Sequence, residues 1–314
     1  MSETRGVVYL LSGTPCAERL AVSLWTLRRL WPGPVTVLVT SDADREAAAT
    51  IAADPAAAID VQPFEPADVP ARHQAYVQKT LVPAHTPYDR TVFIDADTAV
   101  VGSFEELFEP DFAVTAYSNW QTKGRKIGNR CGWWYGRGAG RIQIDEMVDR
   151  VLADEVVVAE DGHGKLEWRL AADGERVVTT GYPAVNTGVT AFKKGCPLSD
   201  RWHRMTLAGA GTHMTDELAM QLLYPFAAAT CECRVQLFDD RFNCSPIHGI
   251  HRDDVRIWHF HGQKHLKRQE GRSLWEPLFR AAIAADFGAL KAWAGRYDKW
   301  VRGLLAGNDP ERIR

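Results

Sequence analysis

Short apolar runs alternate with longer amphipathic segments through the first third of the chain. The apolar runs are rich in valine, which favours buried β-strands. They occupy residues 6–12, 35–40, 59–64 and 91–94. Helical patterns separate them, at residues 18–30, 44–53 and 72–82. Regular alternation of strand and helix predicts an α/β fold, a mostly parallel sheet flanked by helices.

The alternation breaks after residue 109 and resumes near residue 182. In the intervening stretch we expect a helix at 142–154 and a hairpin that pairs 156–158 with 166–170. Further on, the pattern predicts two more strand regions, one helix and a helical tail. Regular structure resumes at 182–192, and the later elements are helix 215–223, strands 234–238 and 255–260, and tail 274–305. We therefore expect one domain over 1–268, with an insertion at 118–181, and a helical C-terminal extension over 269–314.

Composition and charge narrow the class of protein. The 314 residues are 46% hydrophobic and 25% charged, which is ordinary globular composition. A net charge of −3 gives no electrostatic support for binding nucleic acid or an anionic membrane. No apolar segment reaches the roughly 20 residues that a spanning helix needs. We expect a cytoplasmic protein with at most peripheral membrane contact, and the sequence does not indicate its oligomeric state.

The six cysteines show no spacing typical of a disulfide framework, so free thiols are the simplest interpretation. A zinc site is the alternative for one cluster of possible ligands. The cluster consists of Cys231, Cys233, Cys244, His248 and His251. The Cys-x-Cys spacing at its start is one residue short of the usual structural zinc pair, which favours buried thiols.

Two carboxylates, Asp95 and Asp97, follow the apolar run at 91–94. In an extended chain, residues i and i+2 project to the same side, so both carboxylates would point at one small volume. Such a pair repels itself, and a hard divalent cation such as Mg²⁺ or Mn²⁺ relieves that repulsion. The alternative is a pair of solvated acids at a strand end. The carboxyl ends of strands are where α/β sheets bind ligands.

Several segments, in order along the chain, resemble the GT-A glycosyltransferases, most closely family 8 and related bacterial nucleotide-sugar transferases. The resemblance covers residues 6–112 and 182–264. Residues 93–98 (FIDADT) resemble the family's Asp-x-Asp motif, and Lys79 lies one helix upstream, as does a family cation. Residues 186–189 (NTGV) resemble the segment beside the donor sugar. Residues 215–217 (TDE) resemble the helix start that contacts sugar hydroxyls.

A last segment, residues 258–264 (WHFHGQK), resembles the family's closing His-x-x-Gly-x-x-Lys-Pro motif. The match departs from the pattern, because Lys264 follows Gly262 by two residues and His265 stands in place of proline. Lys267 or Arg268 is therefore an alternative phosphate contact. His261 is likewise an alternative to His259 as metal ligand, although the spacing to Gly262 favours His259.

The resemblance implies a Rossmann-like GT-A fold, a nucleotide-sugar donor and Mn²⁺ or Mg²⁺ as cofactor. It assigns the metal to Asp95, Asp97 and His259, and the catalytic roles to Asp216, Glu217 and Lys264. It assigns the donor to Leu11, Ser12, Lys79, Asp95, Ala96, Asn186, Thr187, Gly188 and Gly262.

The implied reaction is transfer of a sugar from a nucleotide diphosphate sugar, with UDP as the expected nucleotide, to a saccharide or another hydroxyl acceptor. Family resemblance implies retention at the anomeric carbon. Inversion is the alternative, with Asp216 or Glu217 as base. Residues 118–141 mix basic and aromatic side chains, either as an acceptor lid or as a surface loop.

Two other functions compete with transfer. One is a phosphatase of the haloacid dehalogenase type, in which one acid of an Asp-x-Asp pair is the nucleophile. In that case Asp239-Asp240 or Asp253-Asp254 would supply the later acidic pair. The other is a catalytically inactive, carbohydrate-binding domain of the same fold.

Overall fold

The structure of the protein is a computed structural model. It describes residues 3–13, 16–116, 133–134, 167–170, 176–179, 185–208, 215–224, 227, 233–244 and 254–260. The first elements in chain order are β1 (Arg5–Leu11), α1 (Ala17–Arg28), β2 (Val35–Val39), α2 (Asp42–Ala52), β3 (Asp60–Pro63), α3 (Ala71–His85) and β4 (Arg90–Ile94). They are followed by β5 (Thr98–Val100), the 3₁₀ helix η2 (Glu105–Phe108), β6 (Phe112–Ala116), β7 (Trp133–Trp134), β8 (Glu167–Leu170) and β9 (Arg176–Thr179). The last are β10 (Val185–Lys193), α5 (Pro197–Ala208), α6 (Thr215–Leu223), β11 (Val235–Phe238), the 3₁₀ helix η6 (Asp240–Phe242) and β12 (Ile257–His259).

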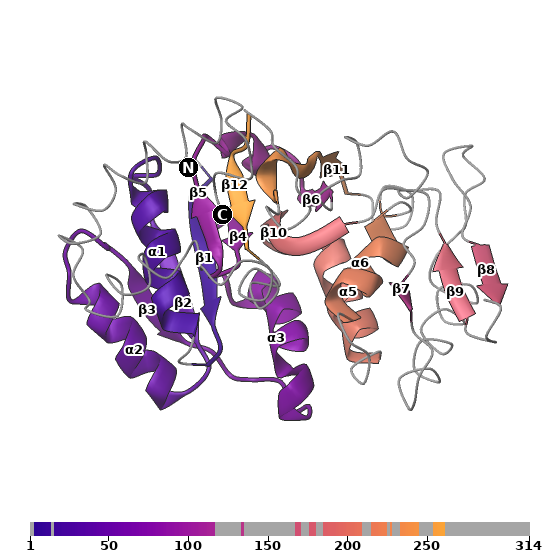
Figure 1. Cartoon of the computed structure of the whole chain (residues 1–314), viewed down its shortest axis with the longest axis horizontal. Coiled ribbons are helices and arrows are strands. Elements are labelled where there is room, and N and C mark those ends of the chain that lie inside the picture. Colours follow the sequence, from indigo (N-terminus) through magenta and orange to yellow (C-terminus); the bar gives the residue numbers. More distant parts are fainter. Residues whose placement is uncertain are drawn as a thin grey trace, which may run out of the picture. The chain divides into compact units, whose positions relative to one another are not determined.

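The largest sheet has seven strands in the order β11-β6-β10-β4-β1-β2-β3. It is a mixed sheet: β1, β2 and β3 run parallel, β11 is parallel to β6, and β10 is antiparallel to β6. Helices flank its strands (Figure 1). The predicted α/β fold, a mostly parallel sheet flanked by helices, is confirmed.

The chain divides into two compact units. Unit 1 comprises Met1–Thr4, Pro66–Val92 and Leu107–Asp239, and unit 2 comprises Arg5–Glu65, Phe93–Glu106 and Asp240–Arg314. The predicted domain limits, 1–268 and 269–314, remain predictions. The insertion at 118–181 and the tail at 269–314 lie largely or wholly outside the described residues.

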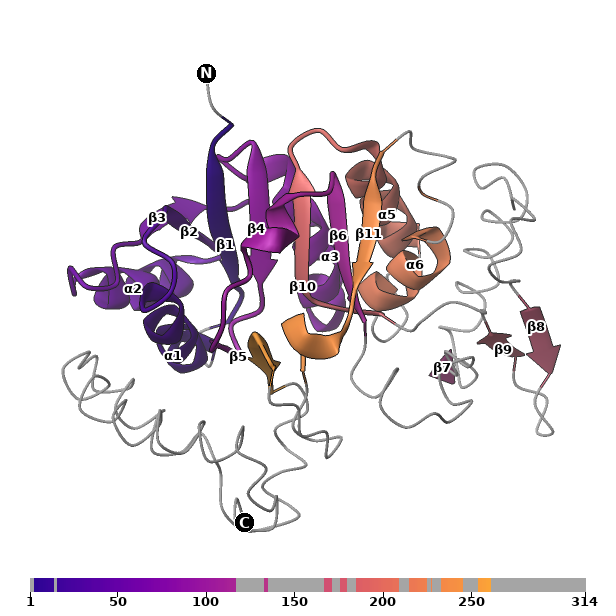
Figure 2. The ribbon, with the colours of Figure 1, turned by 90° about the horizontal axis from the view of Figure 1, so that it is seen from above.

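In unit 2, the parallel strands β1, β2 and β3 are connected through α1 and α2. Residues Val7 to Leu11 of β1 pair with Val35 to Val39 of β2, and β2 is buried over its whole length. Figures 1 and 2 show α1 and α2 side by side along these strands. Ser41 is the N-cap of helix α2. The Ser41 hydroxyl accepts the Asp44 backbone N–H at 3.1 Å and donates to the Asp44 carboxylate at 2.8 Å.

A two-stranded antiparallel pair completes the described part of unit 2. Strand β12 pairs with β5, so that Ile257 lies opposite Val100 and His259 lies opposite Thr98. Helix α1 packs on β5. This pairing brings two segments that are about 160 residues apart in sequence into one register, and it positions the candidate metal ligands described below.

In unit 1, β10 carries an irregularity that matters for the site. Its pairing with β6 shifts register between Asn186 and Thr190, as a β-bulge does. The Thr115 hydroxyl, from β6, bridges the irregular stretch by donating to the backbone oxygens of Asn186 and Val189 at 3.0 and 2.8 Å. Helices α3, α5 and α6 pack on one another in the same unit.

Glu3 and Thr4 are hydrogen-bonded to Asp89 and Arg90, at the start of β4. The Thr4 backbone N–H and hydroxyl donate to Asp89 at 2.8 and 2.9 Å, and the Asp89 N–H donates back to the Thr4 hydroxyl at 3.0 Å. The Arg90 guanidinium donates to Glu3 at 2.5 Å. These hydrogen bonds lower the pKa of both carboxyl groups, with Arg90 as the main cause at Glu3 and the Thr4 backbone as the main cause at Asp89.

Most of the strands and helices predicted from the sequence are confirmed within a few residues. Seven described elements were not predicted: β5, η2, β6, β7, β9, α5 and η6. Strands β5 and β6 are only three and five residues long, and each is wholly buried, so neither shows the alternation that marks a half-exposed strand. Helix α5 has a signal that the prediction overlooked, Pro197 at its first position.

The predicted hairpin of 156–158 with 166–170 remains a prediction, because only its second strand is described. Strand β8 pairs antiparallel with the later β9, with Glu167 opposite Thr179 and Leu170 opposite Arg176. The earlier segment 156–158 lies outside the described residues. So do the predicted helix 142–154 and all of the proposed acceptor lid except Trp133–Trp134. No described helix is long and apolar enough to cross a membrane.

Candidate functional site

Asp95 and Asp97 lie in a turn that connects β4 to β5. The sequence argument placed them on one side of an extended strand, and that detail is wrong. The Thr98 hydroxyl donates to the Asp95 backbone oxygen at 2.9 Å, which closes the turn. The turn, not strand alternation, therefore brings the two carboxylates together.

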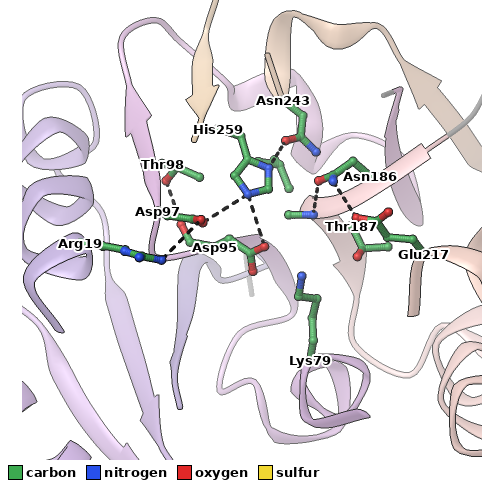
Figure 3. Close-up of polar contacts among 12 residues, drawn as sticks. Arg19, Lys79, Asp95, Asp97, Thr98, Asn186, Thr187, Glu217, Asn243 and His259 are labelled. Atoms are coloured by element: carbon green, nitrogen blue, oxygen red, sulfur yellow. Dashed lines mark hydrogen bonds and ion pairs between the residues drawn. The ribbon is translucent and has the colours of Figure 1, made fainter. Parts of the chain in front are cut away.

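His259 reaches the same point from β12. Its backbone N–H donates to the backbone oxygen of Cys244 at 2.8 Å. The backbone N–H of the next residue, Phe260, donates to the backbone oxygen of Asp97 at 2.9 Å. The imidazole Nε2 lies 3.2 Å from Asp97 Oδ1 and 3.7 Å from Asp95 Oδ2 (Figure 3). The histidine is only 3% exposed, whereas the two carboxylates are partly open to solvent. Each of the three side chains offers a ligand atom, and these atoms lie within 4.8 Å of one another.

This geometry fits a divalent cation. Two neighbouring ligands of an octahedral ion at about 2.1 Å lie about 3.0 Å apart. The separations of 3.2 and 3.7 Å need only small adjustments to reach that value. Two carboxylates and one imidazole are donors that suit Mg²⁺ or Mn²⁺. Arg19 of α1 also lies 4.0 Å from Asp97, so the cluster already attracts positive charge. We call Asp95, Asp97 and His259 the acid–histidine cluster.

Cys16 lies close enough to the acid–histidine cluster for its carboxylates to affect the pKa of the Cys16 thiol, and that thiol stays protonated. Burial raises the pKa of the Cys16 thiol, and the nearby carboxylates raise it further, while Arg19 lowers it. A protonated thiol is a poor metal ligand. The cluster therefore presents oxygen and nitrogen donors. In the described part of the chain it is the one group of His, Cys, Asp and Glu side chains that meets the geometry for an ion.

A chain of buried hydroxyls supports the acid turn. The Tyr9 and Ser23 hydroxyls are 2.9 Å apart, and those of Ser23 and Thr98 are 2.6 Å apart. Thr98 then donates to Asp95, so the chain runs from β1 through α1 to the turn. Tyr9, Ser23 and Thr98 are all fully buried. Burial also raises the pKa of Tyr9, which keeps the phenol a neutral hydrogen-bonding group.

A second residue that the sequence did not single out, Asn243, contacts the histidine. Its side-chain oxygen lies 2.7 Å from His259 Nδ1, on the opposite side of the ring from the carboxylates (Figure 3). Asn243 and His259 are 16 residues apart in sequence. Nothing in the sequence around Asn243 indicates this contact.

The donor residues predicted at the end of β1 differ in what they can offer. Leu11 is fully buried in the core. Ser12 is half-buried, and Gly13 after it has a positive φ of 99°. The Gly13 N–H donates to Asp44 at 3.0 Å, which ties the loop after β1 to the start of α2. Ala96 lies in the acid turn and is half-buried.

A separate set of polar side chains meets in unit 1. Asp216, at the start of α6, accepts the Thr187 hydroxyl of β10 at 2.5 Å and lies 3.6 Å from Lys79 Nζ of α3. Helix α5 holds the segment, because the Trp202 indole N–H donates to the Asp216 backbone oxygen at 2.8 Å. The Asp216 side chain is 2% exposed and that of Lys79 is 13% exposed. Lys79, which was predicted to contact the donor phosphates, is therefore an ion-pair partner of the buried Asp216 carboxylate.

The neighbouring residues continue this network, which we call the polar cluster of unit 1. The Asn186 amide donates to Glu217 at 2.6 Å and its oxygen accepts the Gly188 N–H at 2.9 Å. Gln221, one turn after Glu217 on α6, accepts the Val185 N–H at 2.9 Å. The bulge in β10 turns Asn186 and Thr187 toward α6. The predicted residues 186–188 and 216–217 are thus brought together.

The carboxyl groups of this cluster, Asp216 and Glu217, are buried. Asp216 Oδ1 is buried and has no hydrogen-bond partner among the residues that the structure describes. A buried carboxylate oxygen without a donor is rare in folded proteins and costs free energy. Nearby, burial raises the pKa of Tyr76, and the charges of Asp216 and Glu217 raise it further. The cluster therefore presents an excess of acceptor oxygens.

Several predicted residues lie outside the described part of the chain. They are Gly262, Lys264 and the alternatives His261, Lys267 and Arg268. The alternative zinc cluster is only partly described, with Cys233 and Cys244 as buried cysteines that form no disulfide. Its other members, Cys231, His248 and His251, also lie outside the described residues.

Comparison with known proteins finds likenesses among solved structures. No protein-family model matches the chain, and no curated protein matches it. Among solved structures, the chain is similar to the galactosyltransferase LgtC in complex with donor and acceptor sugar analogs. The two are 14% identical, the match covers 89% of this chain and 95% of that chain, and the TM-score is 0.48. A likeness at this level does not assign the chain to a family.

Proposed function

We propose that the protein is a metal-dependent glycosyltransferase that moves a sugar from a nucleotide diphosphate sugar, with UDP as the nucleotide, to a hydroxyl acceptor. The observation that carries the proposal is the acid–histidine cluster, in which two carboxylates and a nearly buried imidazole offer ligand atoms within 4.8 Å of one another. Resemblance of the surrounding motifs to family 8 supports the donor class. The same resemblance supports retention of the anomeric configuration.

The reaction requires positive charge at the departing diphosphate. The acceptor oxygen bonds to the anomeric carbon, the bond from that carbon to the phosphate oxygen breaks, and the acceptor proton passes to the leaving nucleotide diphosphate. Mn²⁺ or Mg²⁺ held by Asp95, Asp97 and His259 would stabilise the negative charge that develops on that phosphate. Lys264 and Gly262, assigned to the diphosphate by the resemblance, complete the proposed contacts.

The polar cluster of unit 1 supplies the other chemistry that a nucleotide sugar requires, hydrogen-bond partners for sugar hydroxyls. The buried Asp216 Oδ1 offers an acceptor to a hydroxyl donor, and ligand binding would satisfy it. Lys79 Nζ lies 3.6 Å from Asp216 Oδ2, at ion-pair distance, and supplies the counter-charge of this carboxylate. Asn186 orients Glu217 through the 2.6 Å hydrogen bond. We assign Asp216 and Glu217 to the sugar.

A panel of nucleotide sugars with MnCl₂ tests the proposal, scored first as donor hydrolysis and then as transfer to simple alcohols and sugars. We expect nucleotide diphosphate release from at least one donor, its loss with a chelator, and its loss in Asp97→Ala. The matched control is Asp42→Ala, because Asp42 belongs to the same unit and its side chain is 91% exposed. Product analysis by NMR should show the anomeric configuration of the donor.

Other outcomes point to the competing functions. Phosphate release from a simple phosphoester without any nucleotide sugar would favour the phosphatase. Binding of a nucleotide sugar without turnover in any combination would favour the inactive carbohydrate-binding domain. Normal donor turnover by Asp97→Ala would contradict the assignment of the metal.

A further inference from the structure

We infer that Asn243 is a positioning residue that selects the tautomer of His259 and thereby presents its Nε2 lone pair to a cation. The inference rests on the proposed metal function of the acid–histidine cluster. Asn243 Oδ1 and His259 Nδ1 are 2.7 Å apart, and the residues are 2% and 3% exposed. Water therefore has little access to this hydrogen bond.

The chemistry of the two partners fixes the direction of the bond. An amide oxygen only accepts hydrogen bonds, so the ring must donate from Nδ1. In a neutral imidazole that donates from Nδ1, Nε2 carries the lone pair. Nε2 is the nitrogen that faces the carboxylates, at 3.2 Å from Asp97 Oδ1 and 3.7 Å from Asp95 Oδ2.

The opposite tautomer would make the cluster unsuitable for an ion. With the proton on Nε2, the ring would donate a hydrogen bond to Asp97 at 3.2 Å and offer no lone pair on that side. It would also leave the Asn243 oxygen facing a bare ring nitrogen at 2.7 Å, acceptor against acceptor. Asn243 therefore favours the tautomer that a metal requires, which is a role that outer partners of metal-binding histidines commonly have.

The backbone holds Asn243 in register with the histidine independently of its side chain. A parallel bridge joins Cys244 and Trp258, with the Cys244 N–H donating to the Ile257 oxygen at 3.0 Å and the His259 N–H donating to the Cys244 oxygen at 2.8 Å. The Asn243 N–H donates to the Asp240 oxygen of η6 at 3.2 Å. A substitution at position 243 therefore leaves these backbone bonds in place and removes the side-chain contact with His259.

The test uses Asn243→Leu, which is similar in size and lacks the acceptor, with Asn243→Ala as a second variant should the first not fold. Asn243→Asp keeps an acceptor oxygen and serves as the rescue. Phe242→Leu is the packing control, since Phe242 is fully buried beside position 243 and belongs to no proposed site. Long-range ¹H–¹⁵N NMR of the imidazoles reads the tautomer without metal, and electron paramagnetic resonance reads Mn²⁺ affinity.

We expect wild-type His259 to carry its proton on Nδ1, and Asn243→Leu to lose that preference and bind Mn²⁺ about 10- to 100-fold more weakly. Asn243→Asp and Phe242→Leu should keep both the tautomer and the affinity. An Nε2–H tautomer in the wild-type protein would overturn the role of Asn243 and leave the proposed metal function standing. The same holds if Asn243→Leu binds Mn²⁺ as tightly as the wild type. Wild-type protein with the Nδ1–H tautomer and no Mn²⁺ binding would overturn the metal function itself, and with it this role for Asn243.

Discussion

Thr98→Val removes one hydroxyl at the centre of the buried chain that supports the acid turn. Valine has nearly the shape of threonine, so the change creates no cavity. Thr98 is fully buried, and its hydroxyl makes two hydrogen bonds, to the Asp95 oxygen at 2.9 Å and with Ser23 at 2.6 Å. The substitution therefore isolates the contribution of these two bonds.

The expected loss follows from the bonds broken. A buried hydrogen bond contributes about 1 kcal/mol net, so two give a loss of about 2 kcal/mol in the free energy of unfolding. Ser23 keeps its contact with Tyr9 at 2.9 Å, which limits the additional cost. Because the Asp95 carbonyl loses its side-chain donor, the acid turn loosens, and we also expect weaker Mn²⁺ binding.

Thr190→Val is the matched control for this prediction. Thr190 is also fully buried, but its hydroxyl has no hydrogen-bond partner in the part of the chain that the structure describes. Replacing such a hydroxyl with a methyl group should leave stability unchanged or raise it. Denaturant unfolding followed by tryptophan fluorescence measures both variants. The reasoning is refuted if Thr98→Val is as stable as the wild type, or if Thr190→Val loses as much as Thr98→Val.

Two further predictions concern the polar cluster of unit 1 and the hydrogen bonds between Thr4 and Asp89. Lys79→Met should cost about 3 kcal/mol, because it leaves the buried carboxylate of Asp216 without its counter-charge. Adding Asp216→Asn should recover part of that loss in denaturant unfolding, and a double variant no more stable than Lys79→Met would contradict the ion pair. Asp89 has a pKa below its usual 3.8, so its contacts with Thr4 stabilise the fold at neutral pH, and that stability is lost as the pH falls below 3.8. Asp89→Asn should therefore be less stable than wild type at about pH 7, and the difference should shrink below about pH 3 in pH-dependent unfolding; a constant difference would contradict this.

The sequence predicted well those features that local pattern determines. The apolar runs indicated β1 to β4, and the helix predicted at 215–223 is the observed Thr215–Leu223. Asp95 and Asp97 were found because two acids interrupt an apolar run, and His259 because it precedes Gly262 in a recognisable motif. Their convergence in space is now seen, although through a turn and not through an extended strand.

The supporting contacts could not be predicted, because they depend on tertiary pairing of common residue types. Ser23 meets Thr98 across 75 residues of sequence, and neither side chain belongs to a motif. Asn243 reaches His259 only because a single parallel bridge sets the register of their segments. Likewise, Asn186 and Glu217 were each predicted as site residues, yet their mutual hydrogen bond joins β10 to α6 across 31 residues of sequence.

Diffraction from crystals grown with MnCl₂, recorded at the manganese absorption edge, tests the central claim most directly. The account predicts one anomalous peak bound by His259 Nε2 and one oxygen each from Asp95 and Asp97, at about 2.1 Å from each atom. The peak should disappear in Asp97→Ala and persist in Asp42→Ala. The account is contradicted if the ion binds elsewhere. It is also contradicted if these three side chains share no peak at a saturating Mn²⁺ concentration.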